Sequence, residues 1–262
     1  MLMQADHDFH LHTFLSSCSA DPEQTVDRLI AYSRENGLHH LCITDHFWDA
    51  LVPSASDWYR GQDLPHLRRS LPLPNCPDLH LSFGCEAEMD QFFRLGVAPE
   101  HLACFDFLNI ALTHLHMSGF TRPATQTDPR QRATWILQRM DALLSMELPF
   151  HRVGLAHLTT PHLGKDVPGG HVAVLSCISA DDWLPRMRRA AQLGCGIELN
   201  ACAVSDLEPV LRPYRVAKAC GCRFYLGSDA HHPQALTTAA DRFRAMIRLL
   251  SLTEEDKFHL GV

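Results

Sequence analysis

The chain has 262 residues, of which 46% are hydrophobic and 20% are charged. This balance is typical of a protein with a full core, and it excludes disordered, collagen-like and coiled-coil proteins. The formal net charge of −7 disfavours nucleic acid as a partner, because phosphate backbones bind basic surfaces. No apolar run reaches the length of a membrane span, so no membrane segment is expected.

The spacing of apolar residues alternates along the chain between a period of two and a period of about 3.6, which predicts alternating strands and helices. In chain order we expect strand 6–11, a helix from a cap at 21–23 to Gly37, strands 41–44, 79–85 and 105–113, helix 130–146, strand 153–156, helix 180–193, strand 196–199, helix 205–220, strand 223–226 and helix 234–250. Segments 51–78 and 158–178 are expected to be long loops.

About seven strands that alternate with helices predict parallel crossovers, and hence an α/β barrel or an open α/β sheet. No domain boundary is visible, so one domain over 1–262 is expected. The first residues do not form a basic segment followed by an apolar one, so no secretion signal is expected. The 10 cysteines include no C-x-x-C pair. They are expected to be reduced thiols in a cytoplasmic protein.

Side chains that commonly bind metals follow nearly every predicted strand. They are His10 and His12, Asp45 and His46, Glu86, His114, His157, and Asp229 with His231. The imidazoles of His10 and His12 point to the same side, because the residues are two apart in an extended chain. The carboxyl ends of parallel strands meet at one face of a barrel. One strand-end histidine is usually an ordinary solvated residue, but six such positions in one register predict a site.

The ordered set of motifs resembles the PHP (polymerase and histidinol phosphatase) superfamily. It consists of Asp8-Phe9-His10-Leu11-His12-Thr13, Ile43-Thr44-Asp45-His46, Glu86, His114, His157 and Gly227-Ser228-Asp229-Ala230-His231. The match covers residues 6 to about 235. The resemblance implies a distorted seven-stranded, TIM-barrel-like (β/α) barrel, the PHP fold. It also implies a centre of three divalent metal ions that hydrolyses phosphoesters.

The resemblance further implies which side chains hold each ion. His10, His12, Glu86 and Asp229 would hold one ion, and Glu86 would bridge to a second held by His114 and His157. His46 and His231 would hold the third ion, together with a residue that is usually His or Asp in the family and is Cys18 here. Thiolate suits zinc or iron and is a poor ligand for manganese. The alternative is that Cys18 is an ordinary loop cysteine.

Clustered metal ions neutralise phosphoryl oxygens and lower the pKa of bound water. The hypothesis is therefore a metal-dependent phosphoesterase that acts on a small phosphorylated metabolite with zinc, iron or manganese ions. Glu86, Asp229 and His231 are the residues expected to be essential for catalysis. Histidinol phosphate is the leading named substrate, because the chain length and ligand set resemble the histidinol-phosphatase branch. The acid for the leaving group is open, with His232 as one candidate.

Several further residues are candidates for contacts with the substrate or the ligands. His116 and Glu88 follow His114 and Glu86 at a spacing that points them the same way, and Glu198 and Asn200 end a strand at the same face. The sequence does not select among the candidates for phosphate binding or for unplaced loop roles, which are Arg152, Lys165, Arg223, His162 and His171.

Two other classes of function are also considered. An amidohydrolase-like enzyme that cleaves C–N bonds also begins with His-x-His, but it usually bridges its metals with a carbamylated lysine, and Lys165, Lys218 and Lys257 lie elsewhere in the sequence. A non-catalytic metal-binding module is disfavoured by the near-complete ligand set. The oligomeric state is not predicted.

Overall fold

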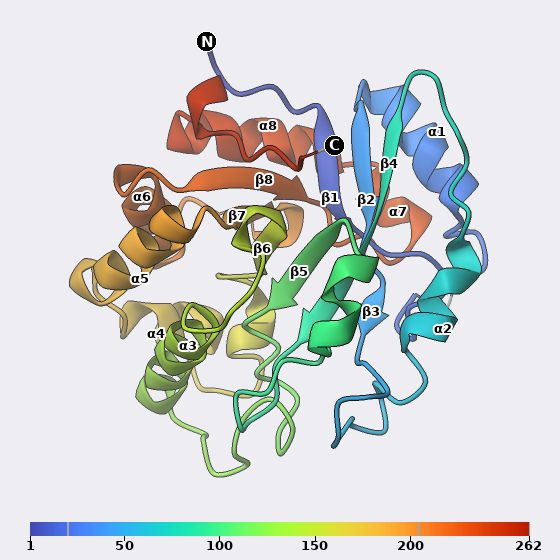
Figure 1. Cartoon of the computed structure of the whole chain (residues 1–262). Coiled ribbons are helices and arrows are strands. Elements are labelled where there is room, and N and C mark those ends of the chain that lie inside the picture. The colour runs from blue at the N-terminus through green and yellow to red at the C-terminus, as the bar shows by residue number, and fades with distance from the viewer. Residues whose placement is uncertain (20, 204, 262) are drawn as a thin grey trace.

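The computed structural model describes residues 1–19, 21–203 and 205–261 (Figure 1). Seven parallel strands form a nearly closed barrel in the order β1 (His7–Leu11), β2 (His40–Ile43), β4 (His80–Glu88), β5 (Phe107–Ala111), β6 (Val153–Ala156), β7 (Gly196–Asn200) and β8 (Arg223–Gly227). The two-residue strand β3 (His46–Phe47) pairs with β4. A parallel bridge between Leu11 in β1 and Ala230, just after β8, joins the first and last edges of this sheet. The predicted TIM-barrel-like α/β fold is confirmed.

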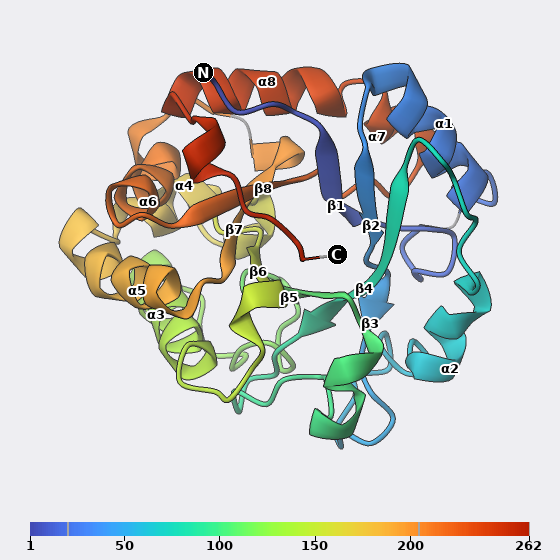
Figure 2. The same ribbon diagram turned by 45° about the horizontal axis from the view of Figure 1, so that its top comes forward.

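Helices surround the barrel, as Figure 2 shows. They are α1 (Val26–Asn36), α2 (Leu64–Leu67), α3 (Pro129–Leu143), α4 (Gly170–Ser176), α5 (Ala180–Leu193), α6 (Glu208–Ala219), α7 (Pro233–Leu236) and α8 (Ala239–Leu250). Short 3-10 turns lie between them: η1 (Arg68–Ser70), η2 (Pro99–Cys104), η3 (Phe150–Arg152), η4 (Pro161–Leu163), η5 (Ala201–Ala203) and η6 (Glu254–Asp256). Among the described residues, none of the helices combines the length and the apolar character that crossing a membrane requires.

Helix boundaries follow the capping side chains. The predicted helix 180–193 is confirmed as α5. Its start is a capping box, in which the Ser179 hydroxyl accepts from the Asp182 N–H and the Asp182 carboxylate accepts from the Ser179 N–H. The predicted helix start at 21–23 is wrong. Thr25 is the N-cap and accepts from the N–H of Arg28, so α1 begins at Val26.

Other differences from the sequence prediction concern short elements. The predicted helix 234–250 is two helices, α7 and α8, because α7 ends at Leu236. The predicted helix 205–220 begins only at Glu208, and the predicted helix 130–146 ends at Leu143. The expected loop 51–78 contains α2 and η1, and the expected loop 158–178 contains η4 and α4.

Aromatic side chains fill the barrel toward the end where the strands begin. Phe107 and Tyr225 pack edge to face with 5.2 Å between ring centroids, and Phe258, from the segment after α8, lies 6.0 Å from Phe107. A Cβ atom at Gly154 would lie 2.5 Å from both the Phe107 ring and the Tyr225 hydroxyl, so glycine is required there. This packing closes one end of the barrel and leaves the carboxyl ends of the strands for a site.

Candidate metal centre

The strand-end side chains predicted from the sequence lie together at the carboxyl end of the barrel. Three groups of described residues have possible ligand atoms within 4.8 Å of one another. They are His10, His12, Glu86 and Asp229; Glu86, His114 and His157; and His12, His46 and His231. In a fourth group, Glu198 joins His10 and His157. His10 and His12 do point the same way, with 3.0 Å between their Nε2 atoms.

Glu86 on β4 lies at the centre of this arrangement. Its side chain is fully buried, and among the described residues no donor has the geometry of a hydrogen bond to either carboxylate oxygen. Five imidazole nitrogens lie around it, at 2.8 Å for His46, 3.0 Å for His157, 3.4 Å for His12, 3.5 Å for His10 and 3.8 Å for His114. A buried carboxylate without donors is costly unless positive charge compensates it. These donor atoms therefore fit shared divalent cations.

The protonation of the centre reflects the same electrostatic balance. Burial opposes charge on both carboxyls, but the surrounding imidazoles hold the pKa of Glu86 and of Asp229 well below their ordinary values. Burial also opposes charge on His157, yet Glu86 and Asp229 raise its pKa to about 10. The pKa of His12 is lowered instead, by burial and by His231 and His46. Two anionic carboxylates among imidazoles form a field that favours bound cations.

Second hydrogen bonds orient four of the imidazoles. The Nδ1–H of His10 donates to Glu198 Oε1 at 2.5 Å, and that of His12 donates to Ser16 Oγ at 3.0 Å. The Nδ1–H of His114 donates to Glu88 Oε2 at 3.0 Å, and that of His231 donates to the Asp229 carbonyl at 2.8 Å. With the proton assigned to Nδ1 from these partners, the neutral form of each imidazole would present the lone pair of Nε2 to a metal ion. This is the arrangement that histidine ligands of metals adopt.

The acceptors of these bonds are themselves held. Ser16 donates to Asp45 Oδ1 at 2.6 Å, and Asp45 also accepts from the Thr13 N–H and hydroxyl at 2.7 Å each. Asp45, which follows a strand end like the ligand candidates, therefore acts through Ser16 on His12. Glu198 Oε2 accepts from the backbone N–H of His157 at 2.7 Å.

Arg139 from α3 holds the carboxylate behind His114. It is fully buried and donates to Glu88 Oε1 at 2.8 Å, while Glu88 is itself fully buried. The remaining guanidinium N–H groups donate to backbone carbonyls, including those of Leu112, Met89 and Thr121 at 2.8–2.9 Å. The charged groups of Arg139 and Glu88 therefore both have hydrogen-bond partners, as a buried ion pair requires.

Two residues of the centre have left-handed backbone conformations that are uncommon outside glycine. His157 has φ 54° and Asp229 has φ 55°. Hydrogen bonds hold both, since the His157 carbonyl accepts from the Thr113 hydroxyl at 2.6 Å and the Asp229 N–H donates to the His10 carbonyl at 2.8 Å. Strained backbone of this kind persists at functional sites when the surroundings fix it.

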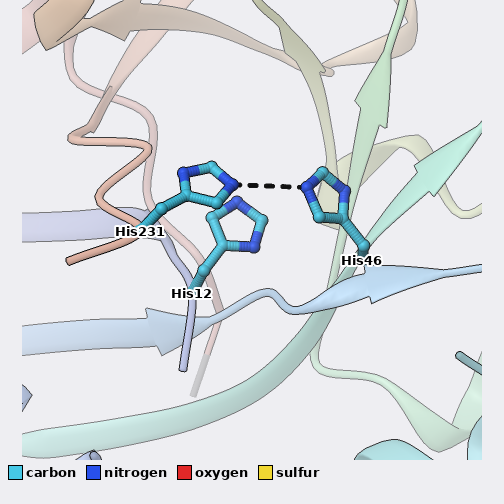
Figure 3. Close-up of side chains that lie close together, drawn as sticks. All are labelled: His12, His46 and His231. Atoms are coloured by element: carbon cyan, nitrogen blue, oxygen red, sulfur yellow. Dashed lines mark hydrogen bonds between the residues drawn. The ribbon is translucent and has the colours of Figure 1, made fainter. Parts of the chain in front are cut away.

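The third imidazole beside His46 and His231 is His12, as Figure 3 shows. The Nε2 atoms of His46 and His231 are 3.3 Å apart, and the His12 ring stacks on His231 with 4.1 Å between centroids. Cys18 lines the cavity above these rings but lies outside the group. Desolvation and the charges of Glu86 and Asp229 raise the pKa of its thiol. A role for Cys18 as a ligand stays a prediction.

Cys18→Ser tests this role directly. If the sulfur binds a metal ion, we expect the variant to lose about one ion per chain or to shift its preference from zinc toward manganese, because a hydroxyl is a harder ligand than a thiolate. Metal analysis after loading with each ion measures both effects. Cys177→Ser, at another exposed cysteine, is the control. Unchanged metal content and preference in Cys18→Ser would make it an ordinary cavity residue.

A cavity of about 620 Å³ opens over the centre. Four residues of the ligand groups line it: His46, His114, Asp229 and His231. The rest of its lining is Cys18, Ser56, Trp58, Tyr59, His116, Met117, Ser118, Phe120 and His162. No lysine or arginine of residues 1–19, 21–203 and 205–261 belongs to this lining. A negatively charged group of a small molecule bound in this cavity would therefore contact the metal centre rather than a lysine or arginine.

Some of the other candidates from the sequence lie at the cavity or beside a proposed ligand, and the rest lie elsewhere. His116 and His162 line the cavity, with 4.5 Å between their ring centroids. Asn200 Nδ2 lies 3.4 Å from Asp229 Oδ2 and donates to it. The remaining candidates do not line the cavity: they are His232, which caps α7, Arg152, which donates to the Phe105 carbonyl, Arg223 at the start of β8, Lys165 and His171.

Sequence reasoning missed Ser16, Arg139 and the aromatic lining of the cavity. Ser16 carries no signal of its own, although it lies between the two predicted ligands His12 and Cys18. Arg139 has one possible signal, since it is an arginine at an apolar position of α3, between the buried residues Ile136 and Met140. Trp58 lies in the proline-containing segment 51–78, whose length suggested a function without naming a residue.

Comparison with known proteins supports the fold. No protein-family model matches the sequence, and no curated protein matches it. Among solved structures, the chain is similar to a histidinol phosphate phosphatase from Lactococcus lactis complexed with zinc, L-histidinol and phosphate. The TM-score is 0.55 at 15% sequence identity, over 97% of this chain and 98% of that one.

A second similar structure is a Listeria monocytogenes protein assigned as a histidinol phosphatase. The TM-score is 0.60 at 12% identity, over 90% of this chain and 99% of that one. At these identities the likeness demonstrates a shared fold over nearly the whole of each chain. That fold is the one the sequence motifs imply.

Proposed function

We propose that this protein is a metal-dependent phosphoesterase that hydrolyses a small phosphomonoester with three divalent metal ions. The observation that carries the proposal is Glu86, a fully buried carboxylate at the point where the imidazole groups meet, to which none of the described residues donates a hydrogen bond. The ligands would be His10, His12, Glu86 and Asp229 for one ion, Glu86, His114 and His157 for the second, and His46 and His231, with Cys18 or His12, for the third.

Bound divalent ions neutralise phosphoryl oxygens and lower the pKa of water. In the reaction, water adds to phosphorus, the ester P–O bond breaks, and the alcohol and inorganic phosphate leave. Glu86 and Asp229 would bring two negative charges to three divalent ions and neutral imidazoles would bring none, so the loaded centre would keep a net positive charge. Glu198, Glu88 and Ser16 fix the imidazole rings, so that the donor atoms are in place before the substrate arrives.

The proposed substrate is a small phosphorylated metabolite, since the cavity measures about 620 Å³. Histidinol phosphate is the first compound to test. The structure from Lactococcus lactis with the same fold is complexed with L-histidinol and phosphate. Zinc is the first metal ion to test for the same reason, with iron and manganese as the alternatives.

A carbamylated-lysine mechanism has no support from the lysine positions. Lys218 donates to the carbonyls of Leu250 and Ser251, and Lys257 pairs with Asp6 and Glu254. Lys165 is exposed and does not line the cavity. Glu86 would supply a bridging carboxylate in place of such a lysine, which favours phosphoester over C–N hydrolysis.

Removal of the metal ions tests the proposal. We expect about three ions per purified chain, and chelation is expected to abolish phosphomonoester hydrolysis. Because the ions bind only the folded chain, chelation should also lower the thermal midpoint by about 5–10 °C. Metal analysis, a panel of phosphorylated metabolites and a thermal scan measure the three effects. A chain with one ion or none, or with full activity in chelator, would contradict the proposal.

A further inference from the structure

The cavity over the metal centre has an aromatic wall that the proposed chemistry does not use. Trp58, Tyr59 and Phe120 form it, with ring centroids 4.6 Å apart for Trp58 and Tyr59 and 5.7 Å apart for Tyr59 and Phe120. This aromatic wall meets the metal centre, since the Trp58 ring lies edge-on to the His46 imidazole at 4.9 Å.

The wall has a rigid support. Trp48, which is buried, packs behind it at 5.1 Å from Phe120 and 6.2 Å from Tyr59. Tyr59 is also fully buried, whereas Trp58 is 37% exposed. The indole of Trp58 is thus an apolar surface held in place at the cavity, and a large exposed apolar side chain beside a site commonly marks a ligand contact.

The charges of the lining define what the wall accepts. Among the described residues of the lining, Asp229 is the only carboxylate, and it belongs to the metal centre. Within the described residues, the lining has no lysine or arginine to pair with a second anionic group and no carboxylate outside the metal centre to pair with an amine.

We infer that the aromatic wall binds the leaving group of the substrate and selects an uncharged aromatic one. The inference rests on the proposed function, since it assigns the phosphoryl group to the metal centre. Aromatic rings bury a large apolar area and gain further from edge-to-face packing on other rings. A primary alcohol that carries an aryl ring is the leaving group that best fits this lining.

Two phosphomonoesters with similar leaving groups test the inference. We expect 2-phenylethyl phosphate to have a kcat/KM at least about tenfold above that of n-butyl phosphate, because only the first presents a ring to the wall. Both release a primary alkoxide, so the difference does not reflect leaving-group reactivity. Histidinol phosphate, which carries an ammonium, and 4-phosphooxybutanoate, which carries a carboxylate, are expected to be poorer substrates than 2-phenylethyl phosphate.

Variants locate the selectivity. Trp58→Ala is expected to reduce the aryl preference to within about threefold, and Trp58→Phe to retain most of it. Phe92→Ala, at an apolar residue that is 68% exposed and outside the cavity lining, is the control and should retain the full preference. Metal content should be unchanged in all three variants.

The outcomes separate the two proposals. Hydrolysis of both esters at equal kcat/KM, or an aryl preference that survives Trp58→Ala, would overturn the aromatic wall as a subsite while leaving the phosphoesterase intact. No hydrolysis of any phosphomonoester by the metal-loaded protein would overturn the proposed function. In that case calorimetric titration with phenylphosphonate tests the wall alone, where Trp58-dependent binding supports it and no binding overturns it.

Discussion

Glu86→Gln is expected to reduce phosphomonoester kcat/KM by at least about 100-fold and to lower the metal content of the protein. The side chain is fully buried and lies within 3.8 Å of imidazole nitrogens from five histidines. Glutamine has nearly the same shape but carries no charge and offers one acceptor oxygen in place of two. The variant therefore removes the negative charge that is proposed to bridge two ions, and it does so without opening a cavity.

Kinetics on the metal-loaded protein and metal analysis measure this prediction. Glu147→Gln, at an exposed carboxylate, is the matched control and should retain full activity. Far-ultraviolet circular dichroism in chelator should give the same spectrum for Glu86→Gln and the unmodified protein, which separates loss of chemistry from loss of fold. Activity within tenfold of the unmodified protein would remove Glu86 from its bridging role.

Arg139→Met is expected to lower the free energy of unfolding by about 3–5 kcal/mol. The substitution leaves the fully buried Glu88 carboxylate without its cation, and several backbone carbonyls lose their donor. An uncompensated buried charge is among the most destabilising changes a core can undergo. His114 should also lose its orientation, so we expect weaker binding of the ion held by His114 and His157.

Urea unfolding in the presence of chelator measures the free energy of unfolding without a contribution from metal binding. Arg130→Met is the control, since Arg130 is exposed on the same helix and should change stability by less than about 0.5 kcal/mol. The double variant Arg139→Met/Glu88→Gln removes the isolated charge, so part of the lost stability should return. A cost of less than about 1 kcal/mol for Arg139→Met would show that the pair contributes little to stability.

The sequence supports prediction of the barrel and of the residues that meet at its mouth. His10 lies near the carboxyl end of β1, and His46 and Asp229 follow the ends of β2 and β8 within three residues. Parallel strands end at the same face whatever the details of the loops. The helix boundaries are less predictable because two competing caps look alike in sequence. Asp21 and Thr25 are both good N-caps, and only the packing of the folded chain selects Thr25.

The supporting contacts of the site could not be predicted because they join distant segments. Arg139 reaches Glu88 across 51 positions of sequence, and its other acceptors come from further loops. Trp58 lies in a segment whose apolar spacing has no period, so periodicity could not indicate that its ring faces the cavity. Glu198 was a candidate for contacts with ligand histidines because it ends a strand at the right face, and it lies beside His10 and His157.

The packed rings of Phe107, Tyr225 and Phe258 limit the routes by which small molecules can enter and leave the barrel. They plug one end of the barrel in the part of the chain that the structure describes, so the metal centre has its access from the opposite mouth. A compound that enters must leave by the way it came. If the protein hydrolyses phosphomonoesters as proposed, the inorganic phosphate that it releases would occupy the site that the next substrate needs, so we expect phosphate to be a competitive inhibitor.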